Sequence, residues 1–329
     1  MPSRTAAART LALALATMLA TLSAMPRADA APWPDRPIHL IVPFPAGSAA
    51  DTVARLIGSK LSERLGQPVV VDDRDGASGE IGTTKLASSD ADGYTIGIAT
   101  TTTLVTAPVI NKAIGYNALN DFAPIAMIGY SPFVLVVYPS VPAKSIQDYI
   151  ALAKAKPGSL SYSSDGEASL ARLGAELFAT MAGIKLTQIP YKSSTQAVVD
   201  LLAGRIDSQF GILTTTQRYI QSGQLRALGV TTARRIEAFP DLPTIAESGL
   251  PGYEASLWLA MIAPAKTPQD IVERLSTEIN QILSQDDIKR ALSGRSIFVD
   301  PHTPAELHAT IQSDLKKWSD LATKADFVQ

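Results

Sequence analysis

The fold is decided by the stretch from Ile38 to Asp51, which reads IHLIVPFPAGSAAD. Its apolar, mostly β-branched start at 38–42 is typical of a strand buried on both faces. Pro43 and Pro45 end the strand because proline has no N–H to donate to a neighbouring strand. The small residues at 47–49 let a ligand approach the backbone. A helix pattern follows, so its first N–H groups and positive dipole end face this loop and favour an anion.

The composition is that of an ordinary globular protein. The chain has 329 residues, of which 46% are hydrophobic and 18% charged, and its formal net charge is -2. This length allows two domains with a large core. The near-neutral charge and the lack of a basic run argue against nucleic-acid binding. Because there is no cysteine, disulfides, thiolate metal sites, thiol nucleophiles and a lipid-modified amino-terminal cysteine are excluded.

The amino terminus has the three parts of a signal peptide. Arg4 and Arg9 give it positive charge, residues 11–22 form an apolar core, and 28–30 read Ala-Asp-Ala, which fits a cleavage site. The apolar core is too short to span a bilayer comfortably. We therefore predict that residues 1–30 are a cleaved signal peptide and that the mature protein is exported without a lipid anchor. A bacterial periplasm fits such a protein.

Strand and helix patterns then alternate. The strand pattern at 68–71 leads into a small-residue loop at 73–79, and the strand pattern at 93–99 ends in four threonines at 100–103. Alternation of this kind predicts right-handed crossovers and a parallel sheet. In open α/β sheets ligands bind outside the carboxyl ends of the strands, where these loops meet.

A second α/β unit of the same design follows, and a return segment closes the chain. Its hydroxyl-rich loop at 163–169 comes after a short strand. The apolar segment at 255–264 reads as a crossing back to the first unit, and three amphipathic helices come after it. We predict domain 1 at 31–132 plus 254–329 and domain 2 at 133–253. The strands expected in the second unit are 133–138, 160–162, 186–191, 206–211 and 225–230.

The chemistry of the side chains gives little support for catalysis. The three histidines lack the spacing of a helical metal pair, and the chain has no HExxH, P-loop or GxSxG motif. Loop carboxylates are candidates for an acid/base catalytic pair, but helix capping and contact with solvent explain the presence of these residues better. We expect no metal site, no cofactor and no catalytic residue. The residues considered are His39, His302 and His308, and Asp51, Asp165 and Glu167.

A series of short motifs follows in a single order along nearly all of the mature chain. The motifs are PWPDRPI at 32–38, VPFPAG at 42–47, Asp51 with Ala54 and Arg55, LGQPVVV at 65–71, DGYT at 92–95, ELF at 176–178, PYK at 190–192, GQLRAL at 223–228, FPDLPT at 239–244 and GLPGYE at 249–254. Together they resemble the substrate-binding proteins of tripartite tricarboxylate transporters, the Bug receptor family.

The resemblance implies a fold and a role. The fold is that of a type II periplasmic binding protein, in which two α/β domains surround a ligand cleft and two crossover strands join them. The role is a monomeric periplasmic receptor that captures a small carboxylate (a di- or tricarboxylate, an aromatic acid or an acidic amino acid) and passes it to a membrane permease. The family binds carboxylates mainly with backbone amides, hydroxyls and ordered water, which agrees with the loops described above.

The resemblance also carries over a set of ligand-binding residues. They come from three loops of the first domain and two of the second. They are Ala46, Gly47, Ser48 and Asp51; Gly76, Ala77 and Gly79; Thr100, Thr101 and Thr102; Ser163, Ser164, Ser169 and Arg172; and Tyr191 and Lys192.

The chain departs from the family pattern at three positions of the second domain. Asp165 and Glu167 stand where neutral residues are common, and they repel an anion unless they face solvent or a ligand ammonium. Arg172 stands where histidine is frequent. It either binds a ligand carboxylate or pairs with Glu167 or Glu176 on the surface. Two other functions stay open: a ligand sensor that signals to a membrane kinase, and an exported enzyme on the same fold.

Overall fold

The computed structural model describes residues 33–164, 169–191 and 193–324. The chain divides into two compact units, Met1–Asp35 and Arg36–Gln329, and only three residues of the first unit are described. All the helices and strands of the described residues belong to the second unit. The predicted signal peptide and the side chains of Asp165, Glu167 and Lys192 lie outside the described residues. Among the described residues, no helix is both long and apolar enough to cross a membrane.

The first sheet region is built on three parallel strands, as predicted. Strand β1 (Ile38–Val42) lies between β2 (Val69–Asp73) and β3 (Thr95–Thr100) and runs parallel to both. The two strands that cross between the regions run antiparallel to their neighbours in the sheet, which the sequence pattern did not predict. Strand β9 (Ser256–Pro264) is antiparallel to β3, and β4 (Phe122–Val137) is antiparallel to β9.

Strand β4 is longer than expected and joins both sheet regions. Residues 122–132 pair with β9, and residues 133–137 pair with β7 (Ser208–Ile212) and β8 (Arg226–Val230). The prediction included only the second part of this strand. In the first part the pairing register shifts between Pro124 and Ala126 and again between Met127 and Gly129. The short strand β10 (Phe298–Val299) also pairs with β4 there.

The second sheet region repeats the parallel design on a smaller scale. Strand β5 (Ser161–Ser164) lies between β6 (Thr187–Pro190) and β7 and runs parallel to both. The strand order through the two regions is β2-β1-β3-β9-β4-β7-β5-β6. Each parallel group ends in loops that start helices, so the sheet has two edges suited to ligands.

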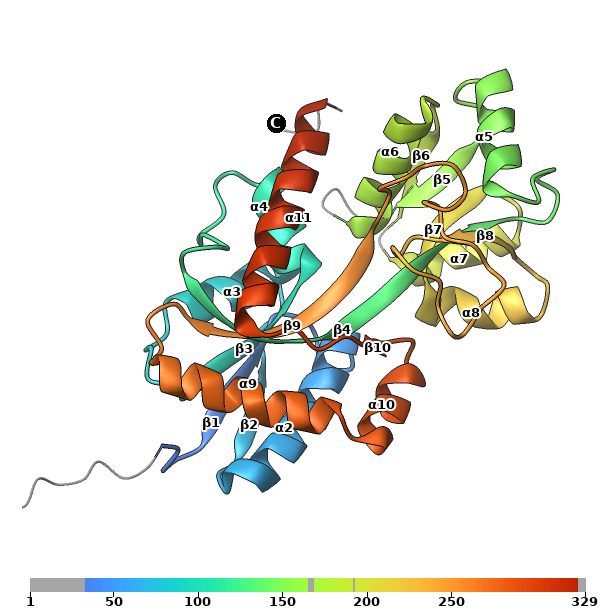
Figure 1. Ribbon diagram of the computed structural model, residues 1–329. Coiled ribbons are helices and arrows are strands. Elements are labelled where there is room, and N and C mark those ends of the chain that lie inside the picture. Colours follow the sequence, from blue (N-terminus) through green and yellow to red (C-terminus); the bar gives the residue numbers. More distant parts are fainter. Residues whose placement is uncertain (1–32, 165–168, 192, 325–329) are drawn as a thin grey trace, which may run out of the picture. The chain divides into compact units, whose positions relative to one another are not determined.

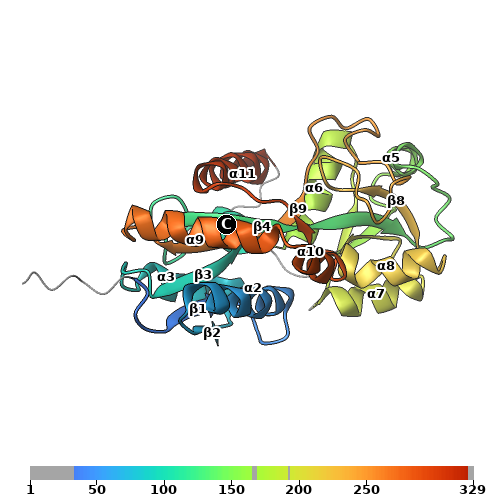
Figure 2. The same cartoon turned by 60° about the horizontal axis from the view of Figure 1, so that its bottom comes forward.

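Helices cover the sheet on both faces. Figures 1 and 2 place α11 (Pro304–Lys324) on the opposite side of β4 and β9 from α2 (Ala49–Leu65). The three amphipathic helices predicted near the end of the chain are α9 (Gln269–Leu283), α10 (Asp286–Ser293) and α11. The other helices and helical turns are η1 (Ala77–Gly79), α3 (Glu80–Ala87), η2 (Thr102–Thr106), α4 (Ala107–Ile110), α5 (Ile146–Ala155), α6 (Leu170–Ala182), α7 (Ser194–Leu202) and α8 (Leu213–Gln221).

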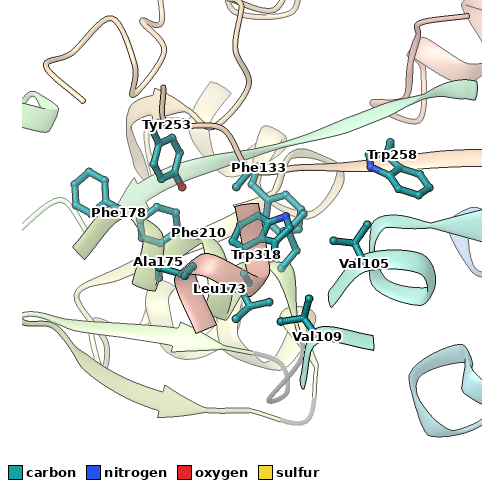
Figure 3. Packing of buried hydrophobic residues seen from close by; sticks show 14 of the residues in the cluster. Val105, Val109, Phe133, Leu173, Ala175, Phe178, Phe210, Tyr253, Trp258 and Trp318 are labelled. Carbon is teal, nitrogen blue, oxygen red and sulfur yellow. The ribbon is translucent and has the colours of Figure 1, made fainter. Parts of the chain in front are cut away.

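An aromatic group forms the centre of the second region's core. Figure 3 shows Phe178 of α6 beside Phe210 of β7 and Tyr253. The ring centroids of Phe178 and Phe210 are 5.6 Å apart, and the Tyr253 ring meets Phe178 edge-on at 6.2 Å. The buried Tyr253 hydroxyl donates to the carbonyl oxygen of Gly174 at 3.0 Å. These contacts hold the segment before β9 against α6.

The chain crosses between the two regions at neighbouring backbone positions. The Thr231 N–H donates to the Phe133 carbonyl oxygen at 3.0 Å, and the Ala255 N–H donates to the Thr231 carbonyl oxygen at 2.9 Å. Phe133 and Ala255 are close to the predicted domain boundaries at 132/133 and 253/254. The division into two domains at these residues stays a prediction.

Candidate ligand-binding site

The first predicted loop is fixed by the helix that follows it. Ser48 caps α2, and its hydroxyl accepts the Asp51 N–H at 3.1 Å. In turn, the Asp51 carboxylate accepts the Gly47 N–H at 2.7 Å, and the Ser48 N–H donates to the Pro45 carbonyl oxygen. The amides of Gly47 and Ser48 are therefore bonded within the loop, while Ala46 and Gly47 are exposed at its tip.

Asp51 belongs to a charged cluster beneath this loop. Its side chain is buried, and the Arg55 guanidinium contacts its carboxylate at 2.6 Å and that of Asp73 at 2.7 Å. Asp73 ends β2. Burial raises the pKa of the Asp73 carboxyl, the neighbouring Asp51 carboxylate adds to the rise, and Arg55 opposes it. Asp51 thus ties the loop to the end of β2 instead of presenting its charge at the loop tip.

The second predicted loop has an unusual backbone. Gly76, Ala77, Ser78 and Gly79 all have positive φ, at 125°, 47°, 56° and 94°. Only three non-glycine residues of the described chain have positive φ, and two of them lie in this turn. Glycine adopts such a conformation freely, but in Ala77 and Ser78 it costs of order 1–3 kcal/mol each, and strain of this kind concentrates at functional sites. The turn is the strongest local sign of function at this edge.

Gly79 shows that the three loops of the first region meet. A Cβ atom placed on Gly79 would lie 2.6 Å from the Thr103 Cγ2 atom and 3.2 Å from the Pro43 carbonyl oxygen. Pro43 follows β1, Gly79 follows β2 and Thr103 follows β3. The predicted convergence at the carboxyl ends of these strands is therefore present in the structure.

The third predicted loop uses most of its hydroxyls to hold its own shape. The Thr103 hydroxyl accepts the Thr100 N–H at 3.0 Å, and the Thr100 hydroxyl accepts the Thr103 N–H at 3.3 Å. The Thr101 hydroxyl donates to the Ser256 carbonyl oxygen at 3.2 Å and accepts the Trp258 N–H at 3.0 Å. Thr100 and Thr101 are buried, and Thr102 is half-buried. After this loop the chain forms a π-helical turn that begins at Thr102.

The predicted residues of the second region lie at the ends of β5 and β6. The Tyr191 N–H donates to the Ser164 carbonyl oxygen at 2.7 Å, and the Ser164 hydroxyl accepts from the Gln188 amide at 2.7 Å. Ser169 caps α6 by accepting the Arg172 N–H at 3.2 Å. These contacts bring Ser164 and Tyr191 together and place Ser169 at the start of the adjacent helix.

Arg172 lies near a second polar network. The Tyr162 hydroxyl donates to the Glu176 carboxylate at 2.6 Å. Burial raises the pKa of the Tyr162 hydroxyl, and the positive charge of Arg172 opposes that rise. Arg172 is therefore within electrostatic range of Tyr162, and both its contact with a ligand and its pairing with Glu167 or Glu176 stay predictions.

Gln209, a polar residue of this region that was not predicted to bind, lies beside Ser163, which was predicted to bind. Gln209 of β7 is 2% exposed, and its amide nitrogen lies 3.4 Å from the Ser194 hydroxyl at the start of α7. Within the described residues, the Gln209 amide oxygen and the Ser163 hydroxyl are buried without a hydrogen-bond partner. The sequence feature that could have identified Gln209 is its place as a glutamine within a predicted strand, next to the apolar Phe210.

A cavity of about 560 Å³ lies elsewhere, where β9 begins and α11 covers it. Its walls include Tyr130, Trp258 and Lys317, none of which was predicted to bind a ligand. The Asp314 carboxylate in its wall already accepts the Trp258 indole N–H at 2.9 Å and pairs with Lys317 at 2.9 Å. For the residues that the structure describes, no group of three or more potential metal ligands is present.

Known proteins resemble this chain over most of its length. The Tripartite tricarboxylate transporter family receptor matches residues 53–327. Protein BugT of Bordetella pertussis is 37% identical over 288 residues, which are 87% of this chain and 88% of BugT. An R. palustris protein solved with adipate is 36% identical, with a TM-score of 0.77 over 89% of this chain and 98% of that protein.

Two further solved structures support the same relationship. The periplasmic binding protein BugD is 31% identical, with a TM-score of 0.73 over 90% of this chain and 99% of BugD. MatC from Rhodopseudomonas palustris, solved with bound malate, is 26% identical, with a TM-score of 0.73 over 88% of this chain and 99% of MatC. These similarities confirm the two-domain α/β fold of periplasmic binding proteins. The chain belongs to the tripartite tricarboxylate transporter receptor family and is related to the Bug proteins.

Proposed function

We propose that this protein is a periplasmic receptor that captures a small carboxylate and delivers it to the membrane permease of a tripartite tricarboxylate transporter. The observation that carries the proposal is its family membership, together with two similar proteins solved with adipate and with malate. Both of those ligands are dicarboxylates. A small aliphatic dicarboxylate is therefore the first ligand class to test.

The geometry of the loops supports this proposal. In the first region the loops after β1, β2 and β3 meet around Gly79, and small residues keep the backbone accessible. In the second region Ser163 and Ser164 end β5, and Ser169 begins α6. Anions bind well where helices begin and hydroxyls gather, because helix N-termini present N–H groups and a positive dipole end. We infer that the carboxylate is held between these two edges.

The export route is part of the same proposal. Residues 1–30 have the charge, apolar core and cleavage site of a signal peptide, and the chain has no cysteine for a lipid anchor. We propose a cleaved, soluble and monomeric receptor. Electrophoresis and intact mass measurement of the protein from a periplasmic extract test the cleavage, and a mature start far from Ala31 would contradict it.

The ligand proposal is tested by isothermal titration of the purified protein with adipate, malate, citrate, glutamate and benzoate. We expect at least one dicarboxylate to bind and to raise the melting temperature, because it binds only the folded state. The variant Ala46→Trp places a bulky side chain at the exposed loop tip and should abolish binding. Ser48 is less suitable, since its hydroxyl caps α2. Ala151→Trp on the exposed face of α5 is the matched control and should bind normally.

Lack of binding to every acid, or normal binding by Ala46→Trp, would contradict the proposed ligand or its place. The alternative of an exported enzyme predicts that the bound acid is converted. We propose binding without turnover, so mass spectrometry after prolonged incubation should recover the ligand unchanged. The alternative of a sensor predicts that gene deletion abolishes a transcriptional response while uptake of the acid continues.

A further inference from the structure

Two polar side chains of the second region are buried without satisfying their hydrogen-bonding groups. Ser163 is 1% exposed and Gln209 is 2% exposed. The Ser163 hydroxyl and the Gln209 amide oxygen bond to no other described residue. A buried polar group without a partner lowers the stability of the fold, so its presence requires an explanation.

The two side chains face the same side of the sheet. Strands β5 and β7 are parallel, and Ser163 lies directly beside Gln209 in their register. Register partners in parallel strands point to the same face. The Gln209 amide nitrogen is 3.4 Å from the Ser194 hydroxyl, so this face is the one covered by the first turn of α7. Ser194 is half-buried and Ser193 is exposed, which places the pair just below an accessible surface.

The space around the Gln209 amide is bounded by the beginnings of two helices. A Cβ atom on Gly211 would lie 3.3 Å from the Gln209 amide oxygen and 2.5 Å from Thr216 Cγ2 in α8. The amide therefore extends toward the end of β7, between the start of α7 and the first turns of α8. Both helices have nine residues and present their positive ends here. An anionic group is the ligand chemistry that these surroundings favour.

We propose that Ser163 and Gln209 bind the far carboxylate of the ligand and make the receptor prefer dicarboxylates over monocarboxylates of the same length. This inference rests on the proposed function. The Ser163 hydroxyl donates one hydrogen bond, and the Gln209 amide turns its NH₂ group to donate a second. After this turn the Gln209 amide oxygen faces the Ser194 hydroxyl, which rotates to donate to it.

Because the two groups have no hydrogen-bond partner, a binding role and a structural role predict different effects of substitution. Ser163→Ala and Gln209→Met each replace a buried unpartnered polar group with an apolar one of similar or smaller size. Removing such a group should leave the free energy of unfolding unchanged or raise it, because its desolvation cost disappears. The same variants should weaken adipate binding about tenfold or more, since a hydrogen bond to a charged group is lost.

Hexanoate is the matched monocarboxylate probe because it has the six carbons of adipate and only one carboxylate. We expect the wild-type protein to bind adipate more tightly than hexanoate, and both variants to lose most of that difference while their affinity for hexanoate stays the same. Equal affinities of the wild type for the two acids, or an unchanged preference in both variants, would overturn the inference. If the wild type binds no carboxylate at all, the proposed function itself fails.

Ser208→Ala is the control for a residue with a structural role. Ser208 neighbours Gln209 in β7, but its hydroxyl donates to the Ser161 carbonyl oxygen at 2.8 Å and bonds to the Tyr149 hydroxyl at 2.7 Å. This variant should lower the melting temperature and keep the preference for adipate. If Ser163→Ala and Gln209→Met behave like Ser208→Ala, the two residues serve the fold and the proposal is wrong.

Discussion

Replacement of Gly79 by alanine tests the convergence of the first region's loops. Gly79 has φ 94° and ψ −1°, a left-handed conformation that costs an alanine roughly 1–2 kcal/mol. The new Cβ would lie 2.6 Å from the buried Thr103 Cγ2 and 3.2 Å from the Pro43 carbonyl oxygen. Overpacking of this kind costs about 1–3 kcal/mol more. We expect the free energy of unfolding to fall by roughly 2–5 kcal/mol.

Gly47→Ala is the matched control because it separates the two causes. Gly47 also has positive φ, at 81°, but a Cβ atom on it would meet nothing within 4 Å. This variant should lose only the conformational part, roughly 1–2 kcal/mol. Urea unfolding followed by circular dichroism measures both variants against the wild type. Equal losses in the two variants would refute the close approach of the three loops.

A second substitution identifies the atom responsible. Thr103→Ser removes Cγ2 and keeps the hydroxyl that accepts the Thr100 N–H. In the Gly79→Ala background it should therefore restore part of the lost stability, although alone it deletes a buried methyl group. A double-mutant cycle measures this coupling directly. Strictly additive effects would show that the alanine methyl group does not press on Thr103.

Two further predictions concern pH and helix capping. Asp73→Asn should stabilise the protein at neutral pH, because burial raises the pKa of the Asp73 carboxyl in the folded state. The wild type therefore loses stability as pH rises from about 4 through that raised pKa, and the advantage of the variant should grow over the same range. Unfolding experiments at several pH values measure this difference. A constant difference across that range would contradict this reasoning. Thr303→Ala should lower the free energy of unfolding by about 1 kcal/mol, because the Thr303 hydroxyl accepts the Glu306 N–H and caps α11. Hydrogen bonds from Thr303 hold the pKa of the Glu306 carboxyl below its usual range. The loss of unfolding free energy in Thr303→Ala should therefore shrink when the pH falls below that pKa. A loss that stays unchanged in acid would show that the cap does not depend on the charge of Glu306.

Local sequence patterns predicted most elements of the fold. The strand at 38–42 is present, with His39 exposed, and the helix after it ends at Gly66, whose left-handed φ of 71° suits a helix stop. The sequence Thr303-Pro304-Ala305-Glu306 has the pattern of a capping box, and the structure forms that box. The similar pattern at 267–270 predicts another box, and this prediction is wrong, because α9 begins after Pro268 without a side-chain cap. Short-range chemistry was therefore a good guide wherever the partners are neighbours in the chain.

The first part of β4 was missed because its sequence does not resemble a strand. Pro124, Gly129 and Pro132 interrupt the apolar pattern, and the register with β9 shifts next to Pro124 and again next to Gly129. Gly129 is required by a contact remote in sequence, since a Cβ atom there would lie 2.3 Å from the Phe298 carbonyl oxygen of β10. The direction of β9 and the place of β10 likewise depend on tertiary pairing that no local pattern encodes.

The same limit explains why Ser163 was predicted as a site residue and Gln209 was not. The hydroxyl-rich sequence around Ser163 reads as a loop, although Ser163 belongs to the end of β5, whereas Gln209 reads as part of a strand. Only the register between β5 and β7 brings the two residues together. A single strand does not show which neighbour its side chains will meet.

The two edges of the sheet differ in how their polar groups are used, and under the proposed function this difference gives them different parts in binding. At the first edge the Gly47 amide bonds to Asp51, the Thr101 hydroxyl bonds to β9, and the loop shapes are fixed by these contacts. Under the proposed function, such a preformed frame would hold the carboxylate that all the proposed ligands share. At the second edge Ser163 and Gln209 are held in place with hydrogen bonds still to make. Discrimination between ligands is strongest where an incorrect ligand leaves buried polar groups unpaired. Selectivity should therefore change with substitutions at β5 and β7, whereas substitutions in the β1 and β2 loops should weaken all carboxylates alike.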